Sequence, residues 1–126
     1  MKQPERDLPA KVLIVDDEPQ ITRVLRTALS TQGYSLRVAS NGVEGMEAVH
    51  DWRPDLVITD LAMPQMDGFE TAMRIRRRRW GREIVLCALS AFDTPEFRER
   101  SDEVGINRYL AKPAEWDELL AVAAAT

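Results

Sequence analysis

The sequence lacks most features that mark secreted, membrane-embedded and nucleic-acid-binding proteins. A single cysteine cannot form an internal disulfide, which argues for a reducing compartment. The longest apolar runs, residues 84–89 and 119–125, are far shorter than the roughly 18 residues of a membrane span. Positive charge is not in excess, because 17 Lys and Arg face 21 Asp and Glu, a net charge of −4. We therefore expect a cytoplasmic domain that neither enters a membrane nor binds nucleic acid directly.

Three continuous apolar runs predict strands that are covered on both faces. They are residues 12–15, 56–58 and 84–89, and they are rich in β-branched side chains. Two further segments, residues 36–39 and 108–111, mix polar and apolar residues, which is typical of edge strands. The sequence therefore predicts three central strands and two edge strands.

Between the strands, apolar residues recur at helical spacing. The first helix would bury a face made of Ile21, Val24, Leu25, Ala28 and Leu29. The second, over about residues 42–51, would turn Val43, Met46 and Val49 inward. The third would start after Gly68, the fourth would run from Thr94 to Gly105, and the fifth would cover residues 116–123.

Strand and helix alternate five times, which predicts an α/β fold with right-handed crossovers. We expect a single doubly wound parallel sheet of five strands, in the order 2-1-3-4-5, with helices on both faces. This is the flavodoxin-like arrangement. Residues 1–10 would form a flexible N-terminal tail and residues 11–126 the only domain, a length that suits one domain.

Each predicted strand of the centre ends in a polar residue. The first runs into Asp16 and Asp17, the third into Asp60 and the fourth into Ser90, while the fifth runs into Lys112. Ligands of open α/β sheets bind beyond the carboxyl ends of the strands, where the strand order reverses, here between the first and third strands. We therefore expect the three carboxylates to converge on one pocket.

Carboxylates so close together repel one another unless a cation lies among them. Mg²⁺ takes oxygen ligands, keeps several waters and accepts phosphate oxygens as further ligands. Lys112 and Ser90 suit phosphoryl oxygens, and a carboxylate can itself be the nucleophile that becomes an aspartyl phosphate. The residues thus predict a Mg²⁺-dependent phosphoryl-transfer site.

Four motifs resemble the receiver domain of two-component response regulators. They are VLIVDDE at residues 12–18, PDLVITDLAMPQMDG at 54–68, LSA at 89–91 and YLAKP at 109–113. The resemblance implies a phosphorylation-controlled switch and not an enzyme that acts on a free substrate. It also implies a sensor histidine kinase or a histidine phosphotransfer protein as the phosphoryl donor.

The resemblance further implies roles for individual residues. Asp60 would accept the phosphoryl group, with Lys112 and Ser90 as its polar partners. The implied Mg²⁺ ligands are Asp16, Asp17, Asp60 and the backbone carbonyl of Ala62. Ser90 and the aromatic Tyr109 would form the switch, which resets the face of the fourth helix, fifth strand and fifth helix. That face could serve an effector domain or a homodimer.

Two positions that flank the phosphoryl group in the family are apolar here, Ala62 and Phe92. Because neither side chain can orient a water molecule, we expect slow loss of the phosphoryl group. Two other interpretations stay open. One is a phosphatase of the haloacid-dehalogenase type, although such enzymes place their aspartates in a D-x-D arrangement. The other is a pseudo-receiver that binds a partner without being phosphorylated.

Three remaining features have simpler interpretations. His50 lies near the end of a helix, where the dipole favours a surface cation. Cys87 lies inside an apolar strand and is expected to be a small core residue. The arginine run at residues 76–79 is expected to be a solvated surface, with a docking role left open.

Overall fold

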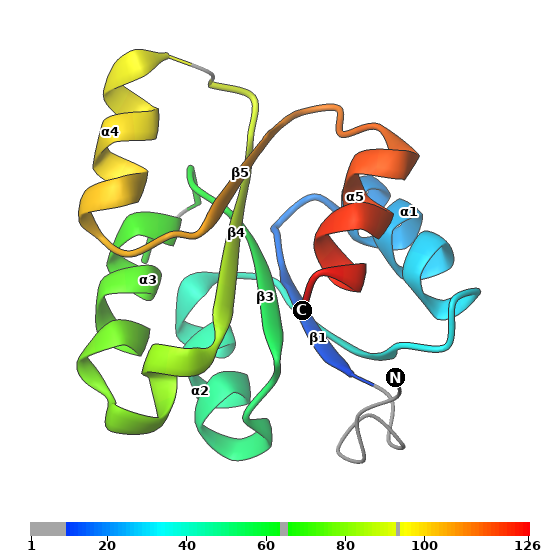
Figure 1. Cartoon of the computed structure of the whole chain (residues 1–126), viewed down its shortest axis with the longest axis horizontal. Coiled ribbons are helices and arrows are strands. Elements are labelled where there is room, and N and C mark those ends of the chain that lie inside the picture. Colours follow the sequence, from blue (N-terminus) through cyan, green and yellow to red (C-terminus); the bar gives the residue numbers. More distant parts are fainter. Residues whose placement is uncertain (1–9, 64–65, 93) are drawn as a thin grey trace.

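The computed structural model describes residues 10–63, 66–92 and 94–126, in which five strands form one parallel sheet (Figure 1). The strands are β1 (Lys11–Val15), β2 (Ser35–Ala39), β3 (Leu56–Asp60), β4 (Val85–Ser90) and β5 (Arg108–Ala111). Their order is β2-β1-β3-β4-β5, which confirms the predicted topology and fold class. The expected tail lies outside the described residues, except for Ala10.

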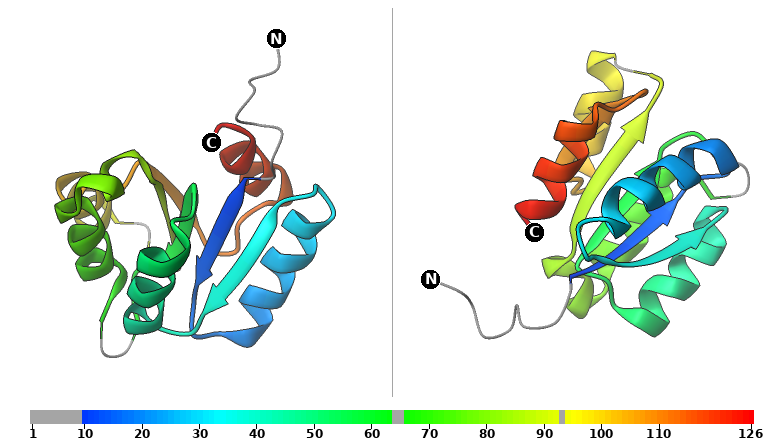
Figure 2. Two further views of the ribbon diagram at one scale, coloured as in Figure 1. Left: turned by 90° about the horizontal axis from the view of Figure 1, so that it is seen from below. Right: turned by 90° about the vertical axis from the view of Figure 1, so that its right-hand side faces the viewer.

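Five α-helices cover the two faces of the sheet. They are α1 (Pro19–Ser30), α2 (Gly42–Trp52), α3 (Gly68–Arg77), α4 (Pro95–Glu103) and α5 (Trp116–Ala124). Helices α1 and α5 lie on one face and α2, α3 and α4 on the other (Figures 1 and 2). A short 3₁₀ helix, η2 (Arg79–Glu83), joins α3 to β4 and was not predicted from the spacing of apolar residues.

The continuous apolar strands are explained by two hydrophobic clusters, one on each face of the sheet. Successive side chains of a strand point to opposite faces. On β1, Leu13 packs in the cluster that contains Ile75 of α3, whereas Ile14 packs in the cluster that contains Leu25 of α1 and Leu119 of α5. Both faces of the central strands are therefore buried.

None of the helices in the described part of the chain has the length and the apolar composition of a membrane-spanning segment.

The expected helix faces were wrong at two valines. Val24 of α1 is 53% exposed and Val43 of α2 is 43% exposed. Val24 lies about 100° around the helix axis from Leu25, and Val43 roughly 120° from Val49, outside the stripe that meets the sheet. The buried positions go instead to small residues such as Gly45, where an added β-carbon would lie 3.1 Å from a Val15 methyl group. A narrow buried stripe brings α2 close to β1.

The arginine run divides into one inward and three outward side chains. Arg77, Arg78 and Arg79 are exposed, as expected, but the prediction of a solvated surface was wrong for Arg76. The Arg76 guanidinium is half-buried, and burial lowers its pKa from the ordinary value. It donates hydrogen bonds to the carbonyls of Gly81, Ile84 and Gly105 and to Asn107 Oδ1. Arg76 therefore ties the end of α3 to η2 and to the segments that lead into β4 and β5.

Candidate functional site

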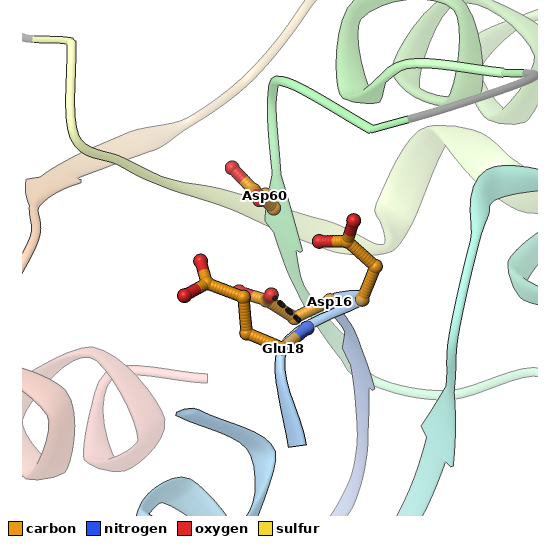
Figure 3. A group of neighbouring side chains, drawn as sticks. Asp16, Glu18 and Asp60 are labelled. Atoms are coloured by element: carbon orange, nitrogen blue, oxygen red, sulfur yellow. Dashed lines mark hydrogen bonds between the residues drawn. The ribbon is translucent and has the colours of Figure 1, made fainter. Parts of the chain in front are cut away.

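Polar residues gather at one end of the sheet, beyond the carboxyl ends of its strands. Asp16 follows β1, Asp60 ends β3, Ser90 ends β4 and Lys112 follows β5. Parallel pairing places these strand ends along the same edge. Figure 3 shows Asp16 and Glu18, from the segment after β1, beside Asp60 at the end of β3. Residues that are far apart in the sequence thus meet at this edge because of the strand order, which the sequence predicted.

An ammonium group links the acidic residues of this site. Lys112 Nζ lies 2.9 Å from Asp16 Oδ2, 3.2 Å from Asp60 Oδ2 and 3.1 Å from Glu18 Oε1. The side chains of Lys112, Asp16 and Asp60 are only 10%, 1% and 7% exposed. Removing one partner of such a buried pair leaves an uncompensated charge, so these three groups depend on one another.

The pKa values of Asp60 and Lys112 are both raised, but for different reasons. Burial raises the pKa of Asp60, and repulsion by Asp16 adds to this, while attraction to Lys112 opposes it. Burial would lower the pKa of Lys112, but its hydrogen bonds to Asp16 and Glu18 and its attraction to both aspartates raise it above its ordinary value. Lys112 therefore stays protonated at neutral pH.

The carboxylates form a donor set suited to a hard divalent cation. One oxygen from each of Asp16, Asp17, Glu18 and Asp60 lies within 4.8 Å of the others. Oxygen donors of this kind, part buried and part exposed, leave room for waters and fit Mg²⁺. Glu18 was not predicted as a member of the cluster, although it directly follows the Asp16-Asp17 pair. Its backbone N–H donates to Asp16 Oδ1 at 2.9 Å, which fixes that carboxylate.

A cavity of about 260 Å³ opens beside Asp60. Its walls include Asp17, Ala62, Phe92 and Lys112. The Ala62 N–H donates to Asp60 Oδ1, with an N–O distance of 3.3 Å. The start of α3 supports this turn, because Gly68 lies so close to the end of β3 that an added β-carbon would be 2.3 Å from the Asp60 carbonyl oxygen.

The two expected switch residues lie beside the cavity but do not line it, as far as the described residues go. Ser90 is fully buried, and its Oγ accepts a hydrogen bond from the Phe92 N–H at 3.0 Å. The Tyr109 hydroxyl donates to the Phe92 carbonyl oxygen, and the Arg98 guanidinium lies 4.7 Å from the Tyr109 ring centre. Both side chains are therefore attached to the segment that follows β4.

Aromatic rings extend from this segment onto the helices. Phe92 is 51% exposed and stacks on Phe97 of α4, with ring centres 5.4 Å apart and planes inclined by 12°. Phe97 in turn lies 5.7 Å from Phe69 of α3. The expectation that Phe92 shields the site is consistent with its place in the cavity wall, but the shielding itself stays a prediction.

The expected places of His50 and Cys87 are confirmed. His50 is exposed at the end of α2, near Asp51. Cys87 is fully buried in β4, and burial raises the pKa of its thiol to about 12. Neither residue lies in the cavity beside Asp60.

Comparisons with known proteins agree with this geometry. The family profile for the response regulator receiver domain matches residues 12–124. The response regulator MprA of Mycobacterium sp. (strain KMS) is 36% identical over 114 residues, which cover 90% of this chain and 49% of that protein. MprA of Mycobacterium leprae (strain TN) is 37% identical over 111 residues, covering 88% and 48%. The chain thus spans about half the length of the curated relatives it matches.

Two solved structures are similar over nearly the whole chain. The chemotaxis protein CheY4 of Vibrio cholerae has a TM-score of 0.88 and 30% identity, and the match covers 93% of this chain and 98% of that one. The receiver domain of sensor histidine kinase PA1611 from Pseudomonas aeruginosa PAO1 has a TM-score of 0.86 and 28% identity, covering 93% and 96%. A magnesium ion is coordinated in the active site cleft of that protein.

Proposed function

The chain belongs to the response regulator receiver domain family, and we propose that it accepts a phosphoryl group on Asp60 as a switch of a two-component system. One observation carries the proposal. The carboxylate of Asp60, almost buried, faces a small cavity into which the ammonium group of Lys112 and the carboxylate of Asp17 also reach. Phosphoryl transfer requires chiefly positioning and charge neutralisation, which these groups supply.

In the proposed reaction, an oxygen of Asp60 attacks the phosphorus atom of a phosphohistidine on the donor protein. The new O–P bond forms as the N–P bond breaks, and the imidazole of the donor leaves. The Ala62 N–H holds the attacking carboxylate in place. Lys112 contacts both Asp16 and Asp60, so it can turn from Asp60 to a phosphoryl oxygen without leaving the site.

We propose that Mg²⁺ binds beside the phosphoacceptor. Asp16, Asp17, Asp60 and the backbone carbonyl of Ala62 would hold it, and Glu18 lies close enough to contribute through water. Bound Mg²⁺ would neutralise negative charge on the phosphoryl oxygens and on the carboxylates. Asp16 is already fixed by the Glu18 N–H, so it would orient the cation relative to Asp60.

The donor and the output are also proposals. A sensor histidine kinase or a histidine phosphotransfer protein would supply the phosphoryl group in the cytoplasm. Phosphorylation would draw Ser90 toward the phosphoryl group and turn Tyr109 inward, which would change the face formed by α4, β5 and α5. An effector domain or a second copy of the chain would bind that face. Support comes from the contact of Tyr109 with the Phe92 carbonyl, which joins β5 to the segment beside the cavity.

Intact mass spectrometry after incubation with acetyl phosphate and Mg²⁺ tests the proposal. The wild type should gain one phosphoryl group and Asp60→Asn none. Asp51→Asn, which changes an exposed aspartate at the end of α2, is the matched control and should behave as the wild type. An equal gain in Asp60→Asn would contradict the assignment. No gain in the wild type, with no bound Mg²⁺, would favour the pseudo-receiver.

The haloacid-dehalogenase phosphatase is not supported by a specific observation. The family match covers residues 12–124, and the candidate nucleophile Asp60 ends β3 instead of β1. Turnover of a free phosphate ester by the wild type, lost in Asp16→Asn and retained in Asp60→Asn, would revive it.

A further inference from the structure

A second and larger hollow lies between α2 and α3, and its volume is about 610 Å³. Its α2 wall includes Met46 and Glu47. Its α3 wall is formed by Arg77, the last residue of α3, and by Arg78, which directly follows that helix. Trp80 of η2 also lines it. We call this hollow the α2–α3 groove. The two helices lie side by side on the same face of the sheet (Figures 1 and 2).

The α2–α3 groove is separate from the site around Asp60. Helices α2 and α3 run antiparallel to the strands, so their C-terminal turns and η2 lie toward the amino ends of the strands (Figure 1). Asp60 lies at the opposite, carboxyl end. No residue lines both cavities among those that the structure describes. A ligand in the groove would therefore not touch the residues that line the cavity beside Asp60.

The α3 wall of the groove carries uncompensated positive charge. Arg74 is paired with Glu70 at 2.9 Å. Arg77 and Arg78 are exposed, and neither forms an ion pair with any residue in the described part of the chain. The helix dipole favours cations at the end of α3. It does not explain why the two unpaired arginines lie beside a cavity, in a chain whose net charge is −4.

The apolar part of the groove is held in a fixed position. Trp80 packs against the core cluster that contains Ile75, and the Arg53 guanidinium lies 3.9 Å from its ring centre. Arg53 is anchored in turn, because its Nε donates to the His50 carbonyl. The ring of Trp80 is thus supported from the core and from α2. Because this apolar surface is already ordered, little conformational entropy would be lost when a ligand binds to it.

We propose that the α2–α3 groove docks an acidic segment of a partner protein that carries a large apolar side chain. The apolar side chain would enter beside Met46 and Trp80, and neighbouring carboxylates of the segment would pair with Arg77 and Arg78. Glu47 and Asp51 on the α2 wall repel negative charge, so the carboxylates of the segment would have to lie beside Arg77 and Arg78 and away from α2. A peptide can place its charges in this way, whereas a phosphate backbone carries one at every nucleotide and fits less well. A cavity of this volume matches one or two side chains, not a whole helix face.

A displayed library of 16-residue peptides tests the proposal without knowledge of the partner. The wild type is the bait, and a charge-reversed variant, Arg77→Glu with Arg78→Glu, removes peptides that bind elsewhere. Peptides that survive should combine Asp or Glu with Leu, Phe or Trp. The best one, synthesised with a fluorescent label, should lose about tenfold or more in affinity for the charge-reversed variant in anisotropy titrations.

The matched control changes the same charge at another surface. Arg23→Glu with Arg26→Glu alters two exposed arginines of α1, on the other face of the sheet, and should leave peptide affinity unchanged. Trp80→Ala should weaken binding as well, provided that its circular dichroism spectrum matches the wild type.

Four results would overturn the proposal. The first is no enrichment over the charge-reversed bait. The second is enrichment of peptides without acidic residues. The third is tighter binding of a 20-base-pair DNA duplex that depends on Arg77 and Arg78, which would make nucleic acid the ligand. The fourth is a dimer in sedimentation that dissociates on charge reversal, which would make a second copy the occupant.

Discussion

Phe92 lines the cavity beside Asp60, so its side chain would flank the phosphoryl group in the proposed reaction. Its backbone carries two contacts, the N–H donating to Ser90 Oγ and the carbonyl accepting from the Tyr109 hydroxyl, which fix the main chain of this residue in the wall of the cavity. Stacking on Phe97 limits the directions in which the ring can turn. An apolar ring cannot orient a water molecule, and the prediction is that this ring also shields a phosphoryl group on Asp60 from water.

The lifetime of phospho-Asp60 should therefore depend on residue 92. Phe92→Asn would place an amide beside the phosphoryl group, where it can position a water molecule, and we expect hydrolysis to become on the order of tenfold faster. Phe92→Leu keeps the position apolar and is the control, with hydrolysis close to the wild-type rate. Decay of the phosphorylated mass over time measures both. Unchanged or slower decay in Phe92→Asn would refute the shielding role.

Cys87 should resist thiol reagents in the folded protein. The side chain is fully buried, and the pKa of about 12 leaves almost no thiolate at pH 8. Iodoacetamide at pH 8 should label the native chain slowly and the chain in 6 M guanidinium rapidly, as followed by intact mass. Equal rates in the two solutions would mean that β4 is not the buried strand described above.

Among the α-helices, α4 has the fewest buried residues. Only Ser101 of its residues is buried, and Phe97 is half-buried. The helix is nevertheless linked to the segment that follows β4 and to α3, because Phe97 stacks on Phe92 and contacts Phe69. Elements with few buried contacts open locally at a low free-energy cost. We therefore expect α4 to be the helix that moves most easily in the proposed switch.

A phosphoryl mimic should therefore move α4 more than the rest of the chain. With beryllofluoride and Mg²⁺, amide resonances of α4, β5 and α5 should shift, while those of η2, at the far end of the sheet, should stay in place. Asp60→Asn provides the blank, because it cannot carry the mimic. An unmoved α4–β5–α5 face in the wild type would contradict the proposed output.

The elements also show what sequence patterns can and cannot predict. The three central strands were predicted because residues buried on both faces must be apolar throughout, and their ends then located Asp16, Asp60 and Ser90. The buried helix stripes were harder, because an apolar residue such as Val24 is also tolerated at the surface. The inward turn of Arg76 depends on carbonyls supplied by η2 and by the segment before β5, which no spacing within α3 reveals.

For the molecule as a whole, the acidic cluster is a local excess of negative charge that folding must tolerate. Lys112 offsets part of it, and Asp17 and Glu18 stay exposed. A cation that binds only the folded cluster would stabilise the folded state, by about 2.7 kcal/mol when its concentration is a hundred times its dissociation constant.

Mg²⁺ should accordingly raise the midpoint of thermal unfolding. Asp17→Asn changes one exposed carboxylate of the proposed Mg²⁺ site without touching the buried ion pair, so the variant should fold normally yet lose most of the shift. Buffers with NaCl matched in ionic strength separate cation binding from general screening. If the wild type and Asp17→Asn respond alike, the cation does not bind at this cluster.

The hydrogen bonds of Arg76 also predict which substitutions in the arginine run are tolerated during evolution. Its acceptors lie around one flat guanidinium, and a lysine at this position would present all its protons from a single nitrogen atom. The four consecutive arginines should therefore differ in how readily evolution replaces them with lysine. We expect that lysine at position 77, 78 or 79 preserves the fold, whereas lysine at position 76 would lose most of these hydrogen bonds and be selected against.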